Sequence, residues 1–243
     1  MATFVLVHGS HDGGWVWQRL APLLREAGHA VYAPTLTGLA DRQHLIDCDV
    51  NLTTHVTDIV GLLTFEDLSD VSLVGNSYGG MVITGVAAKV PQRLARLVYL
   101  DAYVPDDGQC AADLWPPERR AFSEPVVSGP TRVAAPPSPA LFGVSDPTMI
   151  AWMTTRMTPH PLATYEEAVS VGNAASLAVP RTFIHCTDTP VSTPDVFSPF
   201  AAKARSRGWT VHEIDTGHVP MLTAPQALAA VLLDEVGRAE ANE

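Results

Sequence analysis

The sequence predicts an α/β fold in which a mostly parallel sheet is flanked by helices and interrupted once by an inserted cap. Short apolar runs alternate with helix-period segments through the first hundred residues, which is typical of parallel βαβ units. The same alternation returns after Pro180. Between them, eleven of the 20 prolines fall within 104–161, a density that no regular α/β unit tolerates.

The chain of 243 residues, with 47% hydrophobic residues, fits one domain with a single packed core. We expect 1–103 and 176–243 to form the core and 104–175 to form the cap. In order, the expected strands and helices of the core are strand 3–7, helix 15–27 ending at Gly28, strand 30–33, helix 54–63, strand 71–74, a helix after Ser77, strand 97–100, strand 181–186, helix 196–207, strand 209–214 and helix 225–236.

The cap is the least periodic part of the chain. No strand or long helix can pass through Pro116-Pro117 or through 136–139. Its later part predicts two helices, 146–157 and 163–175, with Asp146 as the N-cap of the first and Pro147 at its first position.

Charge and composition exclude several partners. The formal net charge of -11 repels phosphate backbones and anionic lipid, so we expect neither nucleic acid nor a membrane as a partner. The apolar start resembles a strand rather than a signal peptide, and the three cysteines form no disulfide or metal pattern, so a cytoplasmic protein is expected. The oligomeric state stays open, with a homodimer as one option.

The main chemical signal is Gly-x-Ser-x-Gly at 75–79, directly after an apolar strand and before a helix. This context predicts a nucleophile elbow, a strained turn that exposes Ser77 Oγ at the start of the helix. Serine needs a general base, and His218 follows the last expected strand, where the order Ser, acid, His would put it. Among the other histidines, His185 and His212 are expected in strands, and His29, His44 and His55 on the surface.

Acyl transfer also requires hydrogen-bond donors for the oxyanion of the tetrahedral intermediate. The backbone N–H of Tyr78 and that of Ser10, in the glycine-rich loop after the first strand, are the predicted donors of this oxyanion hole. His8 and His11 are expected to shape that loop without titrating.

The acid of the catalytic triad is less constrained, because any of several carboxylates could hold the imidazole. Asp188 is the first choice, since it directly follows strand 181–186, and Asp101, at the end of strand 97–100, is the alternative. Asp195 is expected to cap a helix. No ligand spacing indicates a metal, and no cofactor is needed.

Three segments together resemble the α/β-hydrolase superfamily, and within it the plant methylesterases, plant hydroxynitrile lyases and their bacterial esterase relatives. They are Val7-His8-Gly9-Ser10 with Gly13-Gly14-Trp15, then 73–80, and Gly217-His218. The resemblance implies an α/β-hydrolase fold, Ser77 as nucleophile, His218 as base, main-chain donors at Ser10 and Tyr78, and an acid within 186–189.

Two departures from the lyases favour ester hydrolysis. Those lyases usually carry a lysine after the catalytic histidine and a threonine in the first loop, where this chain has Val219 and Gly9. We therefore expect a serine esterase, a carboxylesterase that cleaves a small, largely apolar ester or lactone through an acyl-enzyme. A hydroxynitrile lyase or other carbon–carbon lyase and a slow-turnover ligand receptor are the alternatives.

Overall fold

A computed structural model describes residues 1–46, 49–116, 126–128, 131–188 and 195–240. Its centre is a six-stranded parallel sheet with the strand order β2-β1-β3-β4-β8-β9. The α/β-hydrolase fold predicted from the sequence is therefore confirmed. The strands are β1 (Thr3–Val7), β2 (Ala30–Tyr32), β3 (Val71–Ser77), β4 (Leu94–Ala102), β8 (Arg181–Cys186) and β9 (Thr210–Ile214).

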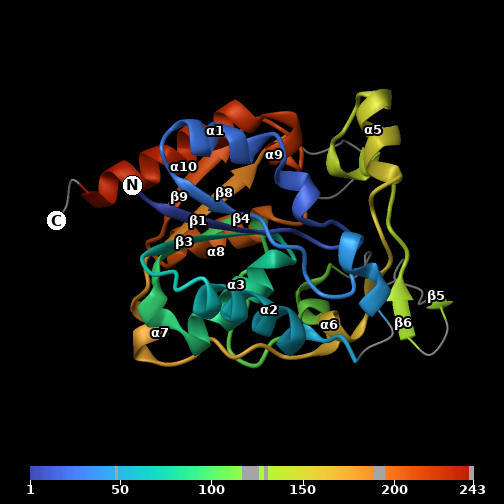
Figure 1. Cartoon of the computed structure of the whole chain (residues 1–243), viewed down its shortest axis with the longest axis horizontal. Helices are drawn as coiled ribbons and strands as arrows, with labels where there is room; N and C mark the ends of the chain where they lie inside the picture. Colours follow the sequence, from blue (N-terminus) through green and yellow to red (C-terminus); the bar gives the residue numbers. More distant parts are fainter. Residues whose placement is uncertain (47–48, 117–125, 129–130, 189–194, 241–243) are drawn as a thin grey trace.

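Helices cover both faces of this sheet (Figure 1). One face carries α1 (Leu20–Glu26) and α10 (Pro225–Glu240), which pack against each other. The other face carries α2 (Leu52–Phe65), α3 (Gly79–Lys89) and α8 (Ser198–Ser206). The short helices η1 (Gly14–Trp17), η2 (Ala40–Leu45), η3 (Pro91–Arg93) and α9 (Pro220–Thr223) lie in the connections.

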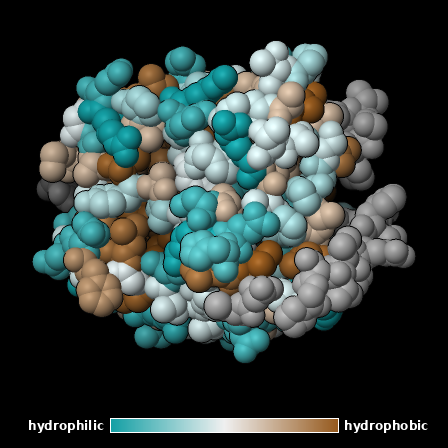
Figure 2. Space-filling model, turned by 45° about the vertical axis from the view of Figure 1, so that its right-hand side comes forward, coloured by the Kyte–Doolittle hydropathy of each residue, from teal (hydrophilic) through white to brown (hydrophobic). Residues whose placement is uncertain are grey.

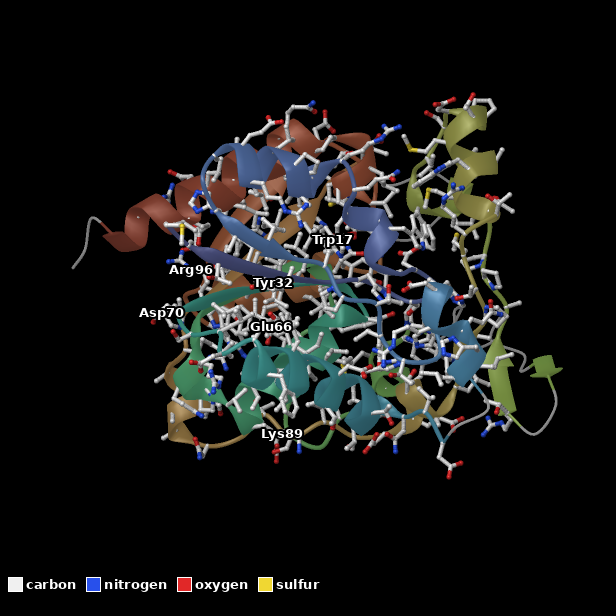
Figure 3. All side chains as sticks on the ribbon, viewed as in Figure 1. Trp17, Tyr32, Glu66, Asp70, Lys89 and Arg96 are labelled. Atoms are coloured by element: carbon white, nitrogen blue, oxygen red, sulfur yellow. The ribbon has the colours of Figure 1, made fainter. Side chains whose placement is uncertain are left out.

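The strands divide their side chains between two apolar cores because successive residues of a strand face opposite sides. In β1, Val5 and Val7 pack in the core with α2 and α3, whereas Phe4 and Leu6 pack in the core with α1 and α10. Trp17 is fully buried in the second core, and Figure 3 places it in the interior. Both faces of the sheet are therefore dry, as buried parallel strands require.

The first and last thirds of the chain follow the sequence closely. Gly28 has φ 87°, which fits its predicted place after α1. Helix α2 begins after Asn51, whose side chain accepts a hydrogen bond from the N–H of Thr54. Most differences from the predicted elements are shifts of one to three residues at their ends, where helices and strands are hardest to delimit.

The cap contains more strand than expected. A three-stranded antiparallel sheet, β5-β6-β7, joins segments on both sides of the second proline cluster. The described elements of the cap are η4 (Ala111–Leu114), β5 (Val126–Ser128), β6 (Thr131–Ala134), η5 (Pro139–Phe142), α5 (Pro147–Thr154), β7 (His160–Pro161), α6 (Ala163–Glu166) and α7 (Ala174–Ala178). The cap contacts the core through its short helices as well as its loops, since α6 packs against α2 and α7 packs against α3.

Helix α5 agrees with its predicted start, because the Asp146 carboxylate accepts from the N–H of Thr148 and Pro147 occupies the first turn. The helix expected over 163–175 is wrong in length, since α6 ends at Glu166. Helix α6 is tied to the core at its end. Its C-cap residue Glu167 accepts hydrogen bonds from the N–H and the hydroxyl of Thr53 in α2.

Figure 2 shows a face dominated by hydrophilic and intermediate residues, with hydrophobic residues in smaller areas between them. In the part of the chain that the structure describes, no helix is both long and apolar enough to cross a membrane.

Candidate active site

Ser77 occupies the last position of β3, at the turn into α3. Its φ of 55° lies in the left-handed region, which residues other than glycine rarely adopt. A Cβ on Gly75 would lie 2.6 Å from the Gly79 carbonyl oxygen, and a Cβ on Gly79 would lie 2.9 Å from the Val7 oxygen. The tight turn therefore depends on glycine at both positions.

His218 lies in the loop between β9 and α9, and its main chain is fixed on both sides. Its N–H donates to Phe142 O at 2.8 Å, and its carbonyl accepts from Nδ2 of Asn76 at 3.4 Å. On the ring, Nδ1 lies 2.6 Å from Oδ2 of Asp101. A neutral imidazole that donates Nδ1–H to a carboxylate has its lone pair at Nε2, as a general base requires.

Asp101 is the next-to-last residue of β4 and has a φ of 44°. Its side chain is only 4% exposed, and its second oxygen accepts from the N–H of Cys186 at 3.1 Å. The following residue, Ala102, is the register partner of Ser77. The parallel pairing of β3 with β4 thus brings Asp101 and Ser77 to the same edge of the sheet.

Among the described residues, Asp188, the predicted acid, makes no hydrogen bond to the His218 imidazole. It lies two residues beyond β8, with an exposed side chain and a backbone N–H that donates to Thr216 O at 3.1 Å. The structure instead joins His218 to Asp101, the alternative position. Because β4 and β8 are neighbours in a parallel sheet, both strands deliver a carboxylate to this edge, and the sequence alone does not choose between them.

Asn76 connects the nucleophile segment to the histidine loop. Its Nδ2 donates to the carbonyls of both Leu100 and His218, and it directly precedes Ser77. Among these described residues, no hydrogen bond joins Ser77 Oγ to the imidazole. Such catalytic hydrogen bonds are often longer in unliganded sites and tighten when substrate binds.

Two aromatic rings contact the imidazole of His218, Phe142 from the cap and Phe197 from the segment before α8. The Phe197 ring stacks on it with centroids 4.6 Å apart and planes 8° from parallel, while Phe142 approaches at 5.6 Å. Phe197 is itself packed against Tyr103 and Phe200. The rings restrict the imidazole to one orientation and make that side of the site apolar.

The two predicted oxyanion donors are both available. Gly9 brings the loop after β1 against the nucleophile, since a Cβ added there would lie 3.0 Å from Ser77 Cβ. Within the described part of the chain, neither the N–H of Ser10 nor that of Tyr78 donates a hydrogen bond. The main-chain N–H groups of Ser10 and Tyr78 therefore stay the candidates for binding an oxygen atom beside Ser77.

Buried histidines surround this loop. His8 accepts from the N–H of Leu36 at Nε2 and donates from Nδ1 to Gly9 O, and burial lowers its pKa to about 4. His8 is therefore neutral near pH 7, as expected. The prediction that His55 lies on the surface is wrong: it is fully buried, and burial lowers its pKa to about 4.

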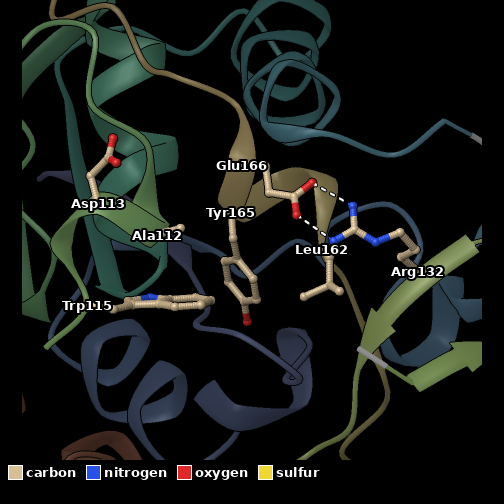
Figure 4. Close-up of a pocket in the computed structure, with 7 residues that line it drawn as sticks. All are labelled: Ala112, Asp113, Trp115, Arg132, Leu162, Tyr165 and Glu166. Carbon is tan, nitrogen blue, oxygen red and sulfur yellow. Dashed lines mark hydrogen bonds and ion pairs between the residues drawn. The ribbon is translucent and has the colours of Figure 1, made fainter. Parts of the chain in front are cut away.

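The cap contains a separate hollow of about 320 Å³ (Figure 4). Trp115, Tyr165 and Leu162 form apolar walls, and the exposed Arg132–Glu166 ion pair lies at its edge. None of the predicted site residues lines it. Among described residues, no group of three or more His, Cys, Asp or Glu side chains could hold a metal ion.

We compared the chain with known protein families, relatives and solved structures. Residues 4–231 match the model of the "Alpha/beta hydrolase family". The chain belongs to this family. It is 38% identical to the "Carbendazim hydrolyzing esterase" of a Nocardioides species, over 96% of this chain and 98% of the relative.

The other relatives agree with the resemblance expected from the sequence. "Methylesterase 3" of Arabidopsis thaliana is 28% identical over 95% of this chain and 94% of that protein. A solved structure of an extracellular α/β-hydrolase from a Paenibacillus species, described as homologous to tobacco Salicylic Acid Binding Protein 2, superimposes with a TM-score of 0.78 at 25% identity, covering 96% of this chain and 98% of that one. The predicted class, a carboxylic-ester hydrolase, is confirmed.

Proposed function

We propose that this hydrolase cleaves its ester through an acyl-enzyme on Ser77, with His218 as general base and Asp101 as the third member of the triad. The supporting observation is the 2.6 Å contact between Asp101 and the imidazole, at the sheet edge where the strained serine lies. Asp101 would keep the histidine in its Nδ1–H tautomer and stabilise the imidazolium.

In the acylation step, Nε2 of His218 takes the Ser77 proton as Oγ attacks the ester carbon. The negative charge on the former carbonyl oxygen is held by the N–H groups of Ser10 and Tyr78. The tetrahedral intermediate then collapses, and His218 gives its proton to the departing alcohol. A water activated by the same nitrogen hydrolyses the acyl-enzyme and restores Ser77.

We further propose that the substrate is a small, largely apolar molecule. Phe197 and Phe142 present apolar surface beside the reacting histidine, which favours an uncharged acyl or alcohol group. The similarity to a carbendazim esterase and to methylesterases adds methyl esters and methyl carbamates to the candidates. The net charge of -11 disfavours nucleic acid and anionic membranes as partners, and the cytoplasmic location stays a prediction.

The test is hydrolysis of a short-chain p-nitrophenyl ester by the parent protein and by Ser77→Ala, followed through the burst and the steady state. We expect one equivalent of p-nitrophenol per chain in the burst and a loss of activity on the order of 10⁴-fold or more in the variant. Equal activity in both proteins would exclude Ser77 as nucleophile.

A substrate panel then separates the remaining functions. It includes carbendazim, aromatic and aliphatic methyl esters, a lactone and an aromatic cyanohydrin. Ester turnover without cyanide release supports the proposal. Cyanide release with no ester turnover would favour the lyase, whereas tight binding with negligible turnover throughout would favour the receptor.

A further inference from the structure

The loop that carries Ser10 is bent and needs outside support. His11, its next residue, has a φ of 68°, a conformation that costs about 1 kcal/mol or more for a residue with a side chain. The adjacent Asp12 is buried, and desolvation raises its pKa to about 7. A loop with this local cost keeps its shape only where surrounding contacts hold it.

The cap supplies those contacts through the segment before and within β7. The carbonyl of His11 accepts from the N–H of Thr158 at 2.9 Å, and His11 Nδ1 donates to the Thr158 carbonyl at 3.0 Å. In addition, the N–H of His11 donates to Nδ1 of His160 at 3.4 Å. Three hydrogen bonds therefore tie the loop to the cap.

The contacts of His160 define its tautomer. A backbone N–H can only donate, so Nδ1 of His160 must be unprotonated to accept from His11. The other nitrogen, Nε2, lies 2.7 Å from the hydroxyl of Thr164, which already donates its own proton to Pro161 O. His160 Nε2 therefore carries the proton, and the fully buried ring is fixed at both nitrogens.

The same ring also packs against the second oxyanion donor. The His160 ring meets the Tyr78 ring edge-on at 4.9 Å and stacks on Tyr165, at 4.5 Å and 18°, on the cap side. Burial raises the pKa of the Tyr78 hydroxyl well above its usual range, so the hydroxyl keeps its proton. The Tyr78 hydroxyl lies 3.0 Å from Nδ1 of His55. Because His55 donates its Nε2–H to Thr37 O, its Nδ1 is an acceptor, and the Tyr78 hydroxyl donates to it.

We infer that His160 is a positioning residue of the oxyanion hole, through which the cap holds both the Ser10 loop and Tyr78. This inference rests on the proposed function. The physical basis is preorganisation, because donors aimed at the developing oxyanion stabilise it only if they do not have to reorient during the reaction. In the described part of the chain, His160 contacts support residues such as His11, Thr164 and Tyr165.

Two polar substitutions separate its hydrogen bonds. In His160→Asn, Oδ1 replaces Nδ1 and keeps an acceptor for the N–H of His11. In His160→Gln, the longer amide replaces Nε2 and keeps the bond to Thr164 but not the acceptor for the loop. Tyr165→Leu is the packing control, since it removes the ring that packs on both His160 and Tyr78 and leaves the hydrogen bonds of His160 to the loop.

The measurements are kcat and KM on a p-nitrophenyl ester, with kcat corrected for the fraction of chains that a phosphonate titrates at Ser77. We expect kcat of His160→Gln to fall about 10- to 100-fold, part of the loss on removing one oxyanion donor, with KM within about threefold. His160→Asn should retain most of the activity. Affinity for a trifluoromethyl ketone, which forms an oxyanion on Ser77, should weaken in His160→Gln in parallel with kcat.

Equal losses in His160→Asn and His160→Gln, or the same loss in Tyr165→Leu, would assign His160 a packing role only and overturn the inference. Unchanged kcat in His160→Gln would overturn it as well. If the phosphonate titrates no site in the parent protein, the proposed function fails first, which distinguishes that result from a failure of the role of His160.

Discussion

The carboxyl edge of the sheet and the cap build the active site by different physical means. At the edge, Ser77 and Asp101 lie at the ends of β3 and β4 and His218 follows β9, and parallel strand pairing and glycines that allow close backbone contact set their places. The cap instead approaches through the segment 158–160, which leads into the short strand β7 and holds the Ser10 loop by hydrogen bonds. The proposed reacting groups come from the sheet edge, and the support of the Ser10 loop comes from the cap.

This difference explains why the edge can be predicted from motifs and the cap cannot. A strand followed by Gly-x-Ser-x-Gly encodes its own geometry over a few residues. A cap residue such as His160 acquires its role only from contacts with His11 and Tyr78, 149 residues away in the first case. Its surrounding sequence carries no pattern that would indicate this role.

The sharpest test within the edge compares its two carboxylates. Asp101→Asn should lower kcat by about 10⁴-fold, because an amide favours the wrong histidine tautomer. Asp188→Asn should stay within about twofold, as expected for an exposed side chain. Steady-state kinetics on one p-nitrophenyl ester measures both, and the reverse order of effects would restore Asp188 as the acid.

The next largest effect concerns the close backbone contacts of the edge. A Cβ on Gly80 would lie 2.2 Å from the carbonyl oxygen of Tyr103, so Gly80→Ala should lower the free energy of unfolding by about 3 kcal/mol or more. Gly28→Ala is the control, since its φ of 87° costs about 1 kcal/mol but nothing lies within 4 Å. Urea unfolding gives both values. Similar losses in the two variants would show that the close contact at Gly80 adds nothing to the cost of a side chain there.

The buried groups between the edge and the cap predict a pH dependence of stability. For His8 and His55 the folded pKa of about 4 lies below the unfolded value of 6.5, so the unfolded chain binds more protons between these values. Each histidine therefore lowers the free energy of unfolding as the pH falls from 6.5 to 4, by about 1.4 kcal/mol per pH unit. Replacing His55 with Gln should reduce the dependence of the free energy of unfolding on pH by about 1.4 kcal/mol per pH unit in this range, the contribution of one proton.

Asp12 changes the free energy of unfolding with pH in the opposite direction. Its folded pKa of about 7 lies above the unfolded 3.8, so the free energy of unfolding that it contributes falls as the pH rises from 3.8 to 7. Asp12→Asn should therefore be more stable than the parent at pH 8 and similar to it at pH 4. Urea unfolding at both pH values checks this, and no gain at pH 8 would mean that the carboxyl is solvated or paired in the folded protein.

The smallest effect belongs to the cap surface. Arg132 and Glu166 form an ion pair at the edge of the cap hollow, with both side chains about half exposed. Arg132→Gln should change the free energy of unfolding by less than about 1 kcal/mol, and by less still in high salt. A larger, salt-independent loss would show that this pair is part of the cap's packing.

The sequence by itself determined the order of strands and helices, the nucleophile elbow at Ser77, and the candidates His218, Ser10 and Tyr78. These follow from hydrophobic period, glycine spacing and position relative to strand ends, all of which act over short stretches of chain. The sequence did not predict the antiparallel sheet of the cap, because its strands are short and the prolines around them interrupt any alternating pattern.

The tertiary structure alone decided which carboxylate meets the imidazole, which rings pack on it, and what holds the oxyanion loop. Asp101 lies at the end of β4 and Asp188 follows β8, and of these two carboxylates Asp101 is the one that reaches Nδ1 of His218. Phe197 and His160 likewise gain their roles from packing between segments far apart in the sequence. Such contacts depend on how the finished fold brings surfaces together, which local sequence patterns do not encode.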